Sequence, residues 1–348
     1  MSDPEFPVEP SAPDTSADDS LPGAGEPRLP LELRETIGVQ PDDPLSEAGR
    51  RVLRYHFERM LFHEPGTRQG IDIEALHDMR VATRRMRSAL RLFKPAYCVK
   101  AIKPFRKELR HIAGTLGVVR DLDVALDRVE RFASAHPEVD LSALRVQWNA
   151  NLLEARAALI VELDSPRFAR FVASFDRFLQ TPGAGARPLP PPDTPAPYQV
   201  RHVIPPLIAN HFARIRAYET VIPGASIPTL HALRIEFKRL RYTLEFFEDV
   251  LGSEARRVIK SIKGMQDHLG DLHDADVAVT ELAAMIDQYE ATYSGTPAYA
   301  RPALDGAYDY LAAQVRERQR LADRFPEAWA GFLSENVRRD LALAVASL

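Results

Sequence analysis

The segment HDMRVATRRMRSALRLF, residues 77–93, recurs in altered form as HALRIEFKRLRYTLEFF, residues 231–247. Two further pairs recur in the same order: YHFERM (55–60) with NHFARI (210–215), and LGVVRDLDVA (116–125) with LGDLHDADVA (269–278). All three pairs are separated by 153–155 residues. A shared order at a nearly constant offset predicts a tandem repeat of helical units, related by an approximate two-fold.

The apolar residues from Leu45 onward recur every three or four positions, and strand-like alternation is missing. This periodicity predicts an all-α protein. The expected helices span residues 46–63, 74–94, 100–116, 121–135, 141–164, 166–180, 199–221, 229–251, 254–269, 274–293, 299–323 and 326–346.

Composition divides the chain into four parts. Residues 1–44 hold eleven acidic and two basic side chains, a net charge of -9, and are rich in proline. So little apolar surface predicts a disordered acidic tail, either a solubilising leader or an arm that screens basic residues elsewhere. Residues 45–180 form the expected first helical repeat, 181–197 a Pro/Gly linker, and 198–348 the second repeat, and the two repeats together make one domain.

Several classes of protein are disfavoured by the overall composition. The net charge of the whole chain is -4, and Cys98 is the one cysteine, so an internal disulfide is excluded. No run approaches the ~20 apolar residues of a membrane-spanning helix. The start of the chain lacks the basic and apolar regions of a secretory signal. These features predict a cytoplasmic protein.

Each repeat gathers its positive residues on one helix face. At about 100° per residue they fall within a sector of about 80°, opposite the apolar residues. The basic faces comprise His77, Arg80, Arg84, Arg87 and Arg91 in the first repeat, and His231, Arg234, Lys238 and Arg241 in the second. The opposite faces comprise Met79, Met86, Leu90 and Phe93, and Leu233, Leu240, Leu244 and Phe247. The next helix of each repeat adds a basic stripe of Lys103, Lys107 and Arg110, or of Arg256, Lys260 and Lys263.

These faces contain no acid, whereas an ordinary solvated face mixes both signs because like charges at helical spacing repel. An ordinary solvated face is one interpretation, and a binding site for an anion with many charges in a row is the one that the recurrence favours. No Gly-Lys pair of a P-loop is present, and GAG at 183–185 lies in the linker. The faces are nearly free of the aromatic residues that stack on bases, and Tyr242 and Phe246 lie toward their flanks. Base-free polyphosphate is therefore favoured over RNA.

Histidine and aspartate residues leave alternatives open. His77 and His231 lie near the starts of their helices, where each could hold a metal, hydrogen-bond a phosphate or serve a structural role. The aspartates Asp121, Asp123, Asp274 and Asp276 follow a glycine. We expect them to cap helix N-termini or to hold stripe arginines, with a bridging Mg²⁺ as the alternative.

The motifs HxxRVxxRRxRSxLRxF and HxLRIxFKRLRYxLExF, with LGxxRDxDV and LGxxHDxDV, resemble the two repeats of the CHAD domain family, over roughly residues 46–346. The resemblance implies two four-helix bundles with extra helices and a basic central cavity or pore. It implies inorganic polyphosphate as the ligand, and association with polyphosphate granules as in bacterial members. It also adds Arg85 and Arg239 to the expected binding residues.

Two positions depart from the repeat pattern: His273 stands where the first repeat has Arg120, and Glu245 where it has Arg91. We therefore expect a second stripe that is weaker or pH-sensitive, and shorter.

The leading functional hypothesis is non-catalytic binding of polyphosphate, with no metal, no cofactor and no membrane association. The alternatives are a metal-dependent enzyme that processes polyphosphate or phosphoesters, and a helical nucleic-acid-binding protein.

Overall fold

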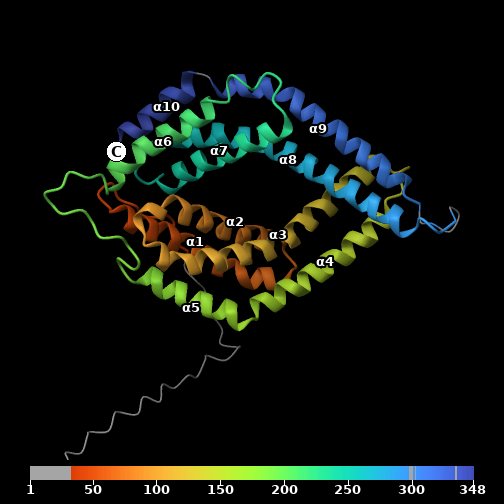
Figure 1. Cartoon of the computed structure of the whole chain (residues 1–348), viewed down its shortest axis with the longest axis horizontal. Coiled ribbons are helices and arrows are strands. Elements are labelled where there is room, and N and C mark those ends of the chain that lie inside the picture. Colours follow the sequence, from red (N-terminus) through yellow and green to blue (C-terminus); the bar gives the residue numbers. More distant parts are fainter. Residues whose placement is uncertain (1–32, 298–300, 302, 334) are drawn as a thin grey trace, which may run out of the picture. The chain divides into compact units, whose positions relative to one another are not determined.

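The computed structural model describes residues 33–297, 301, 303–333 and 335–348 (Figure 1). Over these residues the secondary structure consists of ten α-helices and one short 3₁₀ helix, with no strand, so the all-α prediction is confirmed. The α-helices are α1 (Leu45–Gln69), α2 (Ile73–Leu92), α3 (Val99–Ala135), α4 (Ser142–Leu163), α5 (Pro166–Gln180), α6 (Val200–Arg216), α7 (Ile227–Phe246), α8 (Glu254–Thr292), α9 (Asp305–Phe332) and α10 (Glu335–Ala346). Among the helices described, none is long and apolar enough to cross a membrane.

Two helices are much longer than the sequence predicts. The expected breaks at 117–120 and 270–273 are wrong, because α3 and α8 run without interruption for 37 and 39 residues. A glycine inside a helix costs about 1 kcal/mol. Packing along both halves of each helix offsets this cost: α3 contacts α2 and α4, and α8 contacts α7 and α9.

The predicted break at 324–325 is also wrong, since α9 continues through Pro326 to Phe332. The apolar face of α9 explains this. Leu321, Phe325, Trp329 and Phe332 follow one another at helical spacing and are all buried. Ending the helix at the proline would remove the last two of these side chains from the core.

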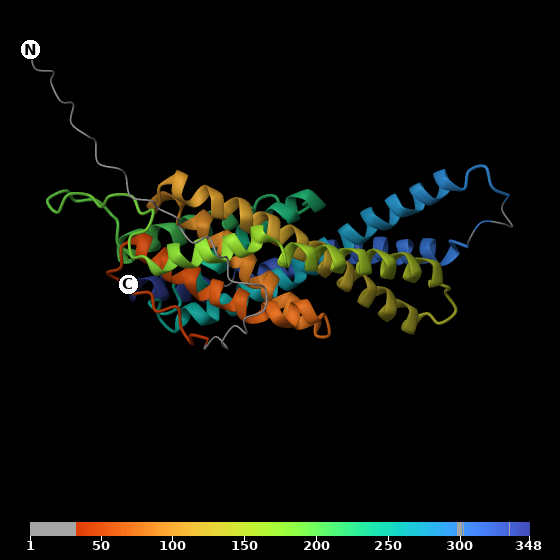
Figure 2. The ribbon, with the colours of Figure 1, turned by 90° about the horizontal axis from the view of Figure 1, so that it is seen from below.

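The helices of residues 33–348 form two groups (Figures 1 and 2). Helix α1 packs on α2 and α5, and α2 packs on α3. In the other group α7 packs on α6 and α8, and α8 packs on α10. The two groups meet where α2 contacts α7 and α1 contacts α6. Here the rings of Phe93 and Phe247, which occupy matching positions in the two sequence repeats, lie 5.8 Å apart. Two features stay predictions: the two-fold relation between the groups, and the central pore.

A smaller apolar cluster lies apart from the main core. It consists of buried residues from α3, α4, α8 and α9 with the loop before α4: Val129, Leu141, Leu144, Trp148, Leu282 and Tyr310. Figure 2 shows these four helices extending beyond the other helices of residues 33–348.

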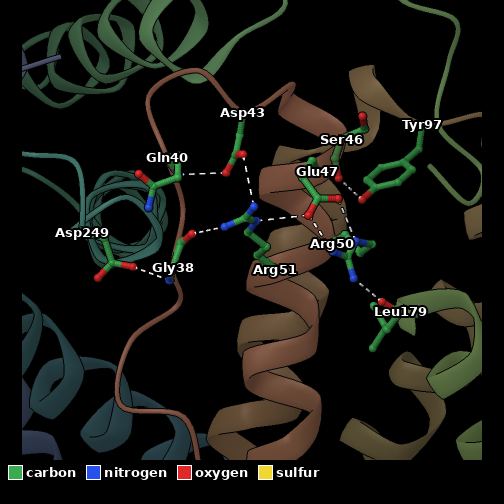
Figure 3. A network of polar contacts seen from close by, with 10 residues as sticks. All are labelled: Gly38, Gln40, Asp43, Ser46, Glu47, Arg50, Arg51, Tyr97, Leu179 and Asp249. Carbon is green, nitrogen blue, oxygen red and sulfur yellow. Dashed lines mark hydrogen bonds and ion pairs between the residues drawn. The ribbon is translucent and has the colours of Figure 1, made fainter. Parts of the chain in front are cut away.

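The segment at 33–44 is not a disordered tail. Val39 is completely buried in the main core, and the Gly38 amide donates to Asp249 Oδ2 at 2.6 Å (Figure 3). Arg51 of α1 donates to the Gly38 carbonyl and pairs with Asp43 at 3.4 Å (Figure 3). The prediction of disorder over 1–44 is therefore wrong for this segment, because one apolar side chain and a few backbone bonds anchor it. Residues 1–32 lie outside the described residues.

The linker at 181–197 has no helix, as predicted, and it is attached to the loop before α3. The Cys98 amide donates to the Gly185 carbonyl at 2.8 Å, and the Arg187 amide donates to the Ala96 carbonyl at 2.9 Å. These bonds fix the course of the chain between the two groups of helices.

Replacing Val39 with alanine tests the anchoring role of the segment at 33–44. The change opens a cavity beneath the segment and should lower the free energy of unfolding by about 2 kcal/mol. Urea denaturation measures the loss. Val118→Ala, at a half-exposed position of α3, is the control and should have little effect. Equal stability of the Val39→Ala variant and the wild type would contradict the anchoring role.

Candidate anion-binding site

Helices α2 and α7 bury the apolar faces that the sequence predicts. Each of the following side chains is completely inaccessible to solvent: Met79, Met86, Leu90, Phe93, Leu233, Leu240, Leu244 and Phe247. Their burial fixes the rotation of both helices about their axes, and the basic faces are directed away from this core. The local start of α7 is set by Ser226, whose hydroxyl accepts from the Thr229 amide, and by Pro228 in the first turn.

Five basic side chains from the two helices form one group, which we call the α2–α7 cluster. It consists of Arg80 and Arg84 from α2 and of Arg234, Lys238 and Arg241 from α7. All five are neither fully buried nor fully exposed. The structure thus brings together basic residues from the two sequence repeats, about 150 positions apart.

Burial, and after it the neighbouring positive charges, lower the pKa values of three members of the cluster. Burial, together with the neighbouring charges of Arg234 and Arg84, lowers the pKa of Lys238 to about 7. Burial also lowers the pKa of Arg84; Tyr242 opposes this, and Arg80 and Arg241 add to it. Burial is again the main cause of the lowered pKa of Arg234. Among the described residues, the charges of Arg84, Arg234 and Lys238 have no ion-pair partner, whereas Arg80 and Arg241 each pair with a carboxylate.

Several hydrogen-bonding atoms of the cluster are buried without a partner. Among the described residues, no acceptor lies within hydrogen-bond distance of Arg84 Nε or Arg234 Nε, and the Tyr242 hydroxyl is also unbonded. No described carboxylate forms an ion pair with Arg84, Arg234 or Lys238. A buried donor without an acceptor costs about 1–3 kcal/mol, more when it is charged. The group is therefore suited to a ligand that supplies several acceptor oxygens and negative charge.

Two carboxylates border the cluster. Asp121 of α3 lies 3.3 Å from Arg80, and burial raises the pKa of Asp121 while Arg80 lowers it. Glu245 of α7 pairs with Arg85 of α2 at 3.0 Å and with Arg241 at 3.5 Å. The residue that interrupts the second basic stripe in the sequence thus connects α2 to α7.

The remaining expected residues lie outside the cluster. Arg85 pairs with Glu245, as described, and Arg239 pairs with Glu236 one turn away, so both arginines are engaged by acids. Arg87 is only partly screened from solvent. This partial burial and then the nearby charge of Arg110 lower its pKa, which indicates that α2 and α3 adjoin through basic residues. The others are exposed on α3 and α8: Lys103, Lys107 and Arg110, and Arg256, Lys260 and Lys263. Arg256 pairs with Glu248 at 3.0 Å.

The two histidines differ in their surroundings. Burial lowers the pKa of His77, and the charge of Arg120 acts in the same direction. The ring of His231 instead lies 4.6 Å from that of His273, the residue that replaces Arg120 in the second repeat. Burial lowers the pKa of His273, followed by the charges of Arg234 and His231.

The four aspartates do not cap helices, because α3 and α8 continue through them; that prediction is wrong. Each pairs with an arginine of another helix: Asp121 with Arg80 (3.3 Å), Asp123 with Arg156 (3.1 Å), Asp274 with Arg128 (2.6 Å) and Asp276 with Arg318 (2.9 Å). The expected contact with a stripe arginine is confirmed for Asp121. Within the described part of the chain, no group of three His, Cys, Asp or Glu side chains is arranged to hold a metal ion.

Three contributors to this region were not predicted. These are the Tyr242 hydroxyl, the bridge from Glu245 to Arg85, and Arg128, which crosses from α3 to α8. Periodicity places Tyr242 and Arg85 beside the basic stripes without indicating what they face. Two surface pockets of about 550 and 420 Å³ lie elsewhere, between α3 and α5 and between α8 and α9, and cluster residues line neither.

Comparison with known proteins identifies the family and the fold. Residues 51–283 match the family described as CHAD domain. The chain belongs to the CHAD domain family. Its fold is similar to that in the crystal structure of the CHAD domain from the plant Ricinus communis, with a TM-score of 0.59 and 24% identity over 91% of this chain and 97% of that one. It is also similar to PptA from Streptomyces chartreusis, with a TM-score of 0.58 and 17% identity over 83% of this chain and 100% of that one.

Two curated relatives of this CHAD protein come from Mycobacterium tuberculosis: the uncharacterized protein MT2285 of strain CDC 1551 / Oshkosh and the uncharacterized protein Rv2226 of strain ATCC 25618 / H37Rv. Each is 28% identical over 252 residues, which cover 68% of this chain. The chain spans 44% of the length of these relatives.

The lowered pKa of Lys238 predicts a characteristic pH dependence of stability. Between about 7 and its ordinary value of 10.5, the lysine is neutral in the folded protein and protonated in the unfolded chain. Unfolding then takes up a proton, so the contribution of Lys238 to stability is least favourable below pH 7 and improves as the pH rises through this window.

The Lys238→Met variant isolates this effect, because methionine does not titrate. The free energy of unfolding of the wild type, minus that of the variant, should increase steadily between pH 7 and 10 in urea denaturation. A difference that stays constant over this range would show that Lys238 is protonated normally.

Proposed function

We propose that this protein binds inorganic polyphosphate without catalysis, through the α2–α7 cluster, and associates with polyphosphate granules. One observation carries the proposal. Arginine and lysine side chains of two helices converge while buried donors, including Arg84 Nε and Arg234 Nε, have no acceptor among the described residues. Each phosphate of a polyphosphate chain offers oxygen acceptors and negative charge, which arginine binds with directed, charge-assisted hydrogen bonds.

The aromatic residues near the cluster support a ligand without bases. Tyr242 and Phe246 are buried and stack on one another, with ring centroids 6.0 Å apart. Binding of single-stranded nucleic acid commonly uses exposed rings on which bases stack. These two rings are engaged in the core, which favours polyphosphate over RNA as the ligand.

The carboxylates near the cluster support binding rather than catalysis. Asp121 and Asp274 pair with Arg80 and Arg128, so their charge is already partly neutralised. A metal-dependent hydrolase needs carboxylates that are free to coordinate the ion. Membership of the CHAD family, whose implied ligand is inorganic polyphosphate, points in the same direction.

Replacing Arg84 and Arg234 with glutamine tests the binding site. The double change should weaken binding of labelled long-chain polyphosphate by roughly tenfold or more for each arginine, since a hydrogen bond to a charged group contributes about 1.5–3 kcal/mol. It should not unfold the protein, because it also relieves repulsion within the cluster. Fluorescence titration measures affinity, and thermal melting monitors the fold.

The matched control is Arg170→Gln with Arg177→Gln, which removes two exposed arginines from α5. Affinity of the wild type should fall steeply with rising salt, as it does when counterions are released from other polyanions.

In cells, the wild type should gather at polyphosphate granules and the Arg84/Arg234 variant should remain dispersed. If the two double variants bind polyphosphate with equal affinity, binding depends on the overall positive charge of the surface and not on the α2–α7 cluster.

The absence of catalysis is a separate prediction. Incubation with polyphosphate should leave the chain length unchanged and release no orthophosphate, with or without Mg²⁺. Mg²⁺ should weaken binding, because it pairs with the anion. Orthophosphate released in proportion to protein, and lost in Asp121→Asn or Asp274→Asn, would establish an enzyme instead.

A further inference from the structure

The outer face of α4 carries a continuous apolar stripe that the described structure leaves uncovered. Val146, Leu153 and Val161 are 72%, 70% and 71% exposed. Ala150 and Ala157 lie between them and are also exposed. The opposite face of α4 packs into the smaller apolar cluster through Leu144 and Trp148. The stripe therefore belongs to a helix that is already supported from its other side (Figure 1).

The spacing of the stripe is that of a seam between two helices. Its five members follow at intervals of four, three, four and four residues. On a helical wheel they fall within about 80°. Single exposed apolar residues are common on protein surfaces, whereas an aligned series at alternating spacing is typical of packed helices.

Helix α9, on the other side of the smaller apolar cluster, provides an internal comparison. Tyr308, Ala312 and Val315 are exposed at the same intervals of four and three residues. On α9 this series is surrounded by exposed charges: Asp309, Arg316, Arg320, Asp323 and Arg324. On α4, Glu154 is the single exposed charged residue between Ser142 and Val161. The outer face of α9 therefore has the charged residues of a solvated surface, and the outer face of α4 lacks them.

We propose that α4 is a self-association surface, on which α4 of a second copy of this chain packs antiparallel about a two-fold axis. An axis between positions 151 and 152 sets Val146 opposite Ala157 of the second copy, and Ala150 opposite Leu153 of the second copy. Val146 and Leu153 then each meet an alanine, and Val161 meets Ser142 of the second copy. Each large side chain thus faces a small one, which lets two helices approach closely. A helix pair related by a two-fold uses the same residues from both copies, as a closed dimer requires.

The flanks of the stripe are compatible with this register. Gln147 falls near Glu154 of the second copy, where an amide can donate to the carboxylate. Asn149 falls near Arg156 of the second copy on the other flank. Within one copy Arg156 already pairs with Asp123 at 3.1 Å. No like charges face one another, so the charge pattern permits the dimer.

A lipid surface is a less suitable occupant. Helices that lie on membranes usually flank their apolar face with lysine and arginine, which attract anionic lipids. The exposed flanks of α4 consist of alanines, amides and Glu154.

Dimerisation would place two α2–α7 clusters on one particle. If a long polymer binds to both clusters at once, its overall affinity increases although neither site gains a new contact. This consequence rests on the proposed polyphosphate function, whereas the dimer itself does not.

Light scattering after size exclusion, over a range of micromolar concentrations, tests the proposal on the full chain without polyphosphate. The wild type should be dimeric at high concentration, and Leu153→Glu should be monomeric with an unchanged circular dichroism spectrum. The control Val315→Glu, on the outer face of α9, should remain dimeric. A monomeric wild type, or a Leu153→Glu variant that stays dimeric, overturns the proposal, as does a monomer that floats with anionic lipid vesicles.

Disulfide trapping tests the register. In a Cys98→Ser background, the pair Ala150→Cys and Leu153→Cys should form covalent dimers on mild oxidation, because each cysteine faces the other residue of the second copy. The matched pair Ala312→Cys and Val315→Cys on α9 should not. Equal trapping at both helices, or none at α4, contradicts the proposed pairing. Efficient trapping by Val146→Cys alone would indicate a parallel arrangement and overturn the antiparallel one, because the antiparallel register offsets the two copies of residue 146 by eleven residues, or about 16 Å.

Discussion

Like-charge repulsion between α2 and α7 is the constraint around which the site is arranged. Arg84 and Lys238 come from distant parts of the sequence, and no described carboxylate pairs with either. Apolar packing elsewhere holds them together: the opposite faces of both helices are completely buried, and Phe93 and Phe247 contact each other across the junction. The fold thus maintains an unfavourable concentration of charge that an anionic ligand would relieve.

Acidic residues determine how far this concentration of charge extends. Glu245 pairs with Arg85 and Arg241, which limits the cluster at one edge and also connects α2 with α7. Asp121 borders it through Arg80. The aspartates of α3 and α8 continue the pattern away from the cluster by pairing with arginines of neighbouring helices. Aspartate and glutamate residues therefore neutralise the arginines around the cluster, and the arginines without such a partner remain available to a ligand.

Two differences separate comparable parts of the chain: the neighbours of the two motif histidines, and the outer faces of α4 and α9. Arg120 acts on His77 as a positive charge, whereas the residue beside His231 is His273, whose own pKa is lowered by burial. The outer face of α9 is charged, and that of α4 is apolar over the same spacing. If α4 mediates self-association, the second difference has a direct cause, because one outer face meets another copy and the other meets water.

The sequence by itself determined the helical fold, the repeated motif and the face that each basic residue occupies. Local periodicity decides these features: Met79 and Leu233 had to be buried if Arg80 and Arg234 lay on the opposite side of their helices. The course of α3 and α8 through their glycines, and the anchoring of Val39, depended on contacts with distant segments that no local pattern records. The same holds for the site. Periodicity selected Arg84 and Arg85 equally, but only the packing of α7 beside α2 pairs Arg85 with Glu245 and leaves Arg84 without a carboxylate. Charge compensation is a property of distance in space, and that distance is set by tertiary structure.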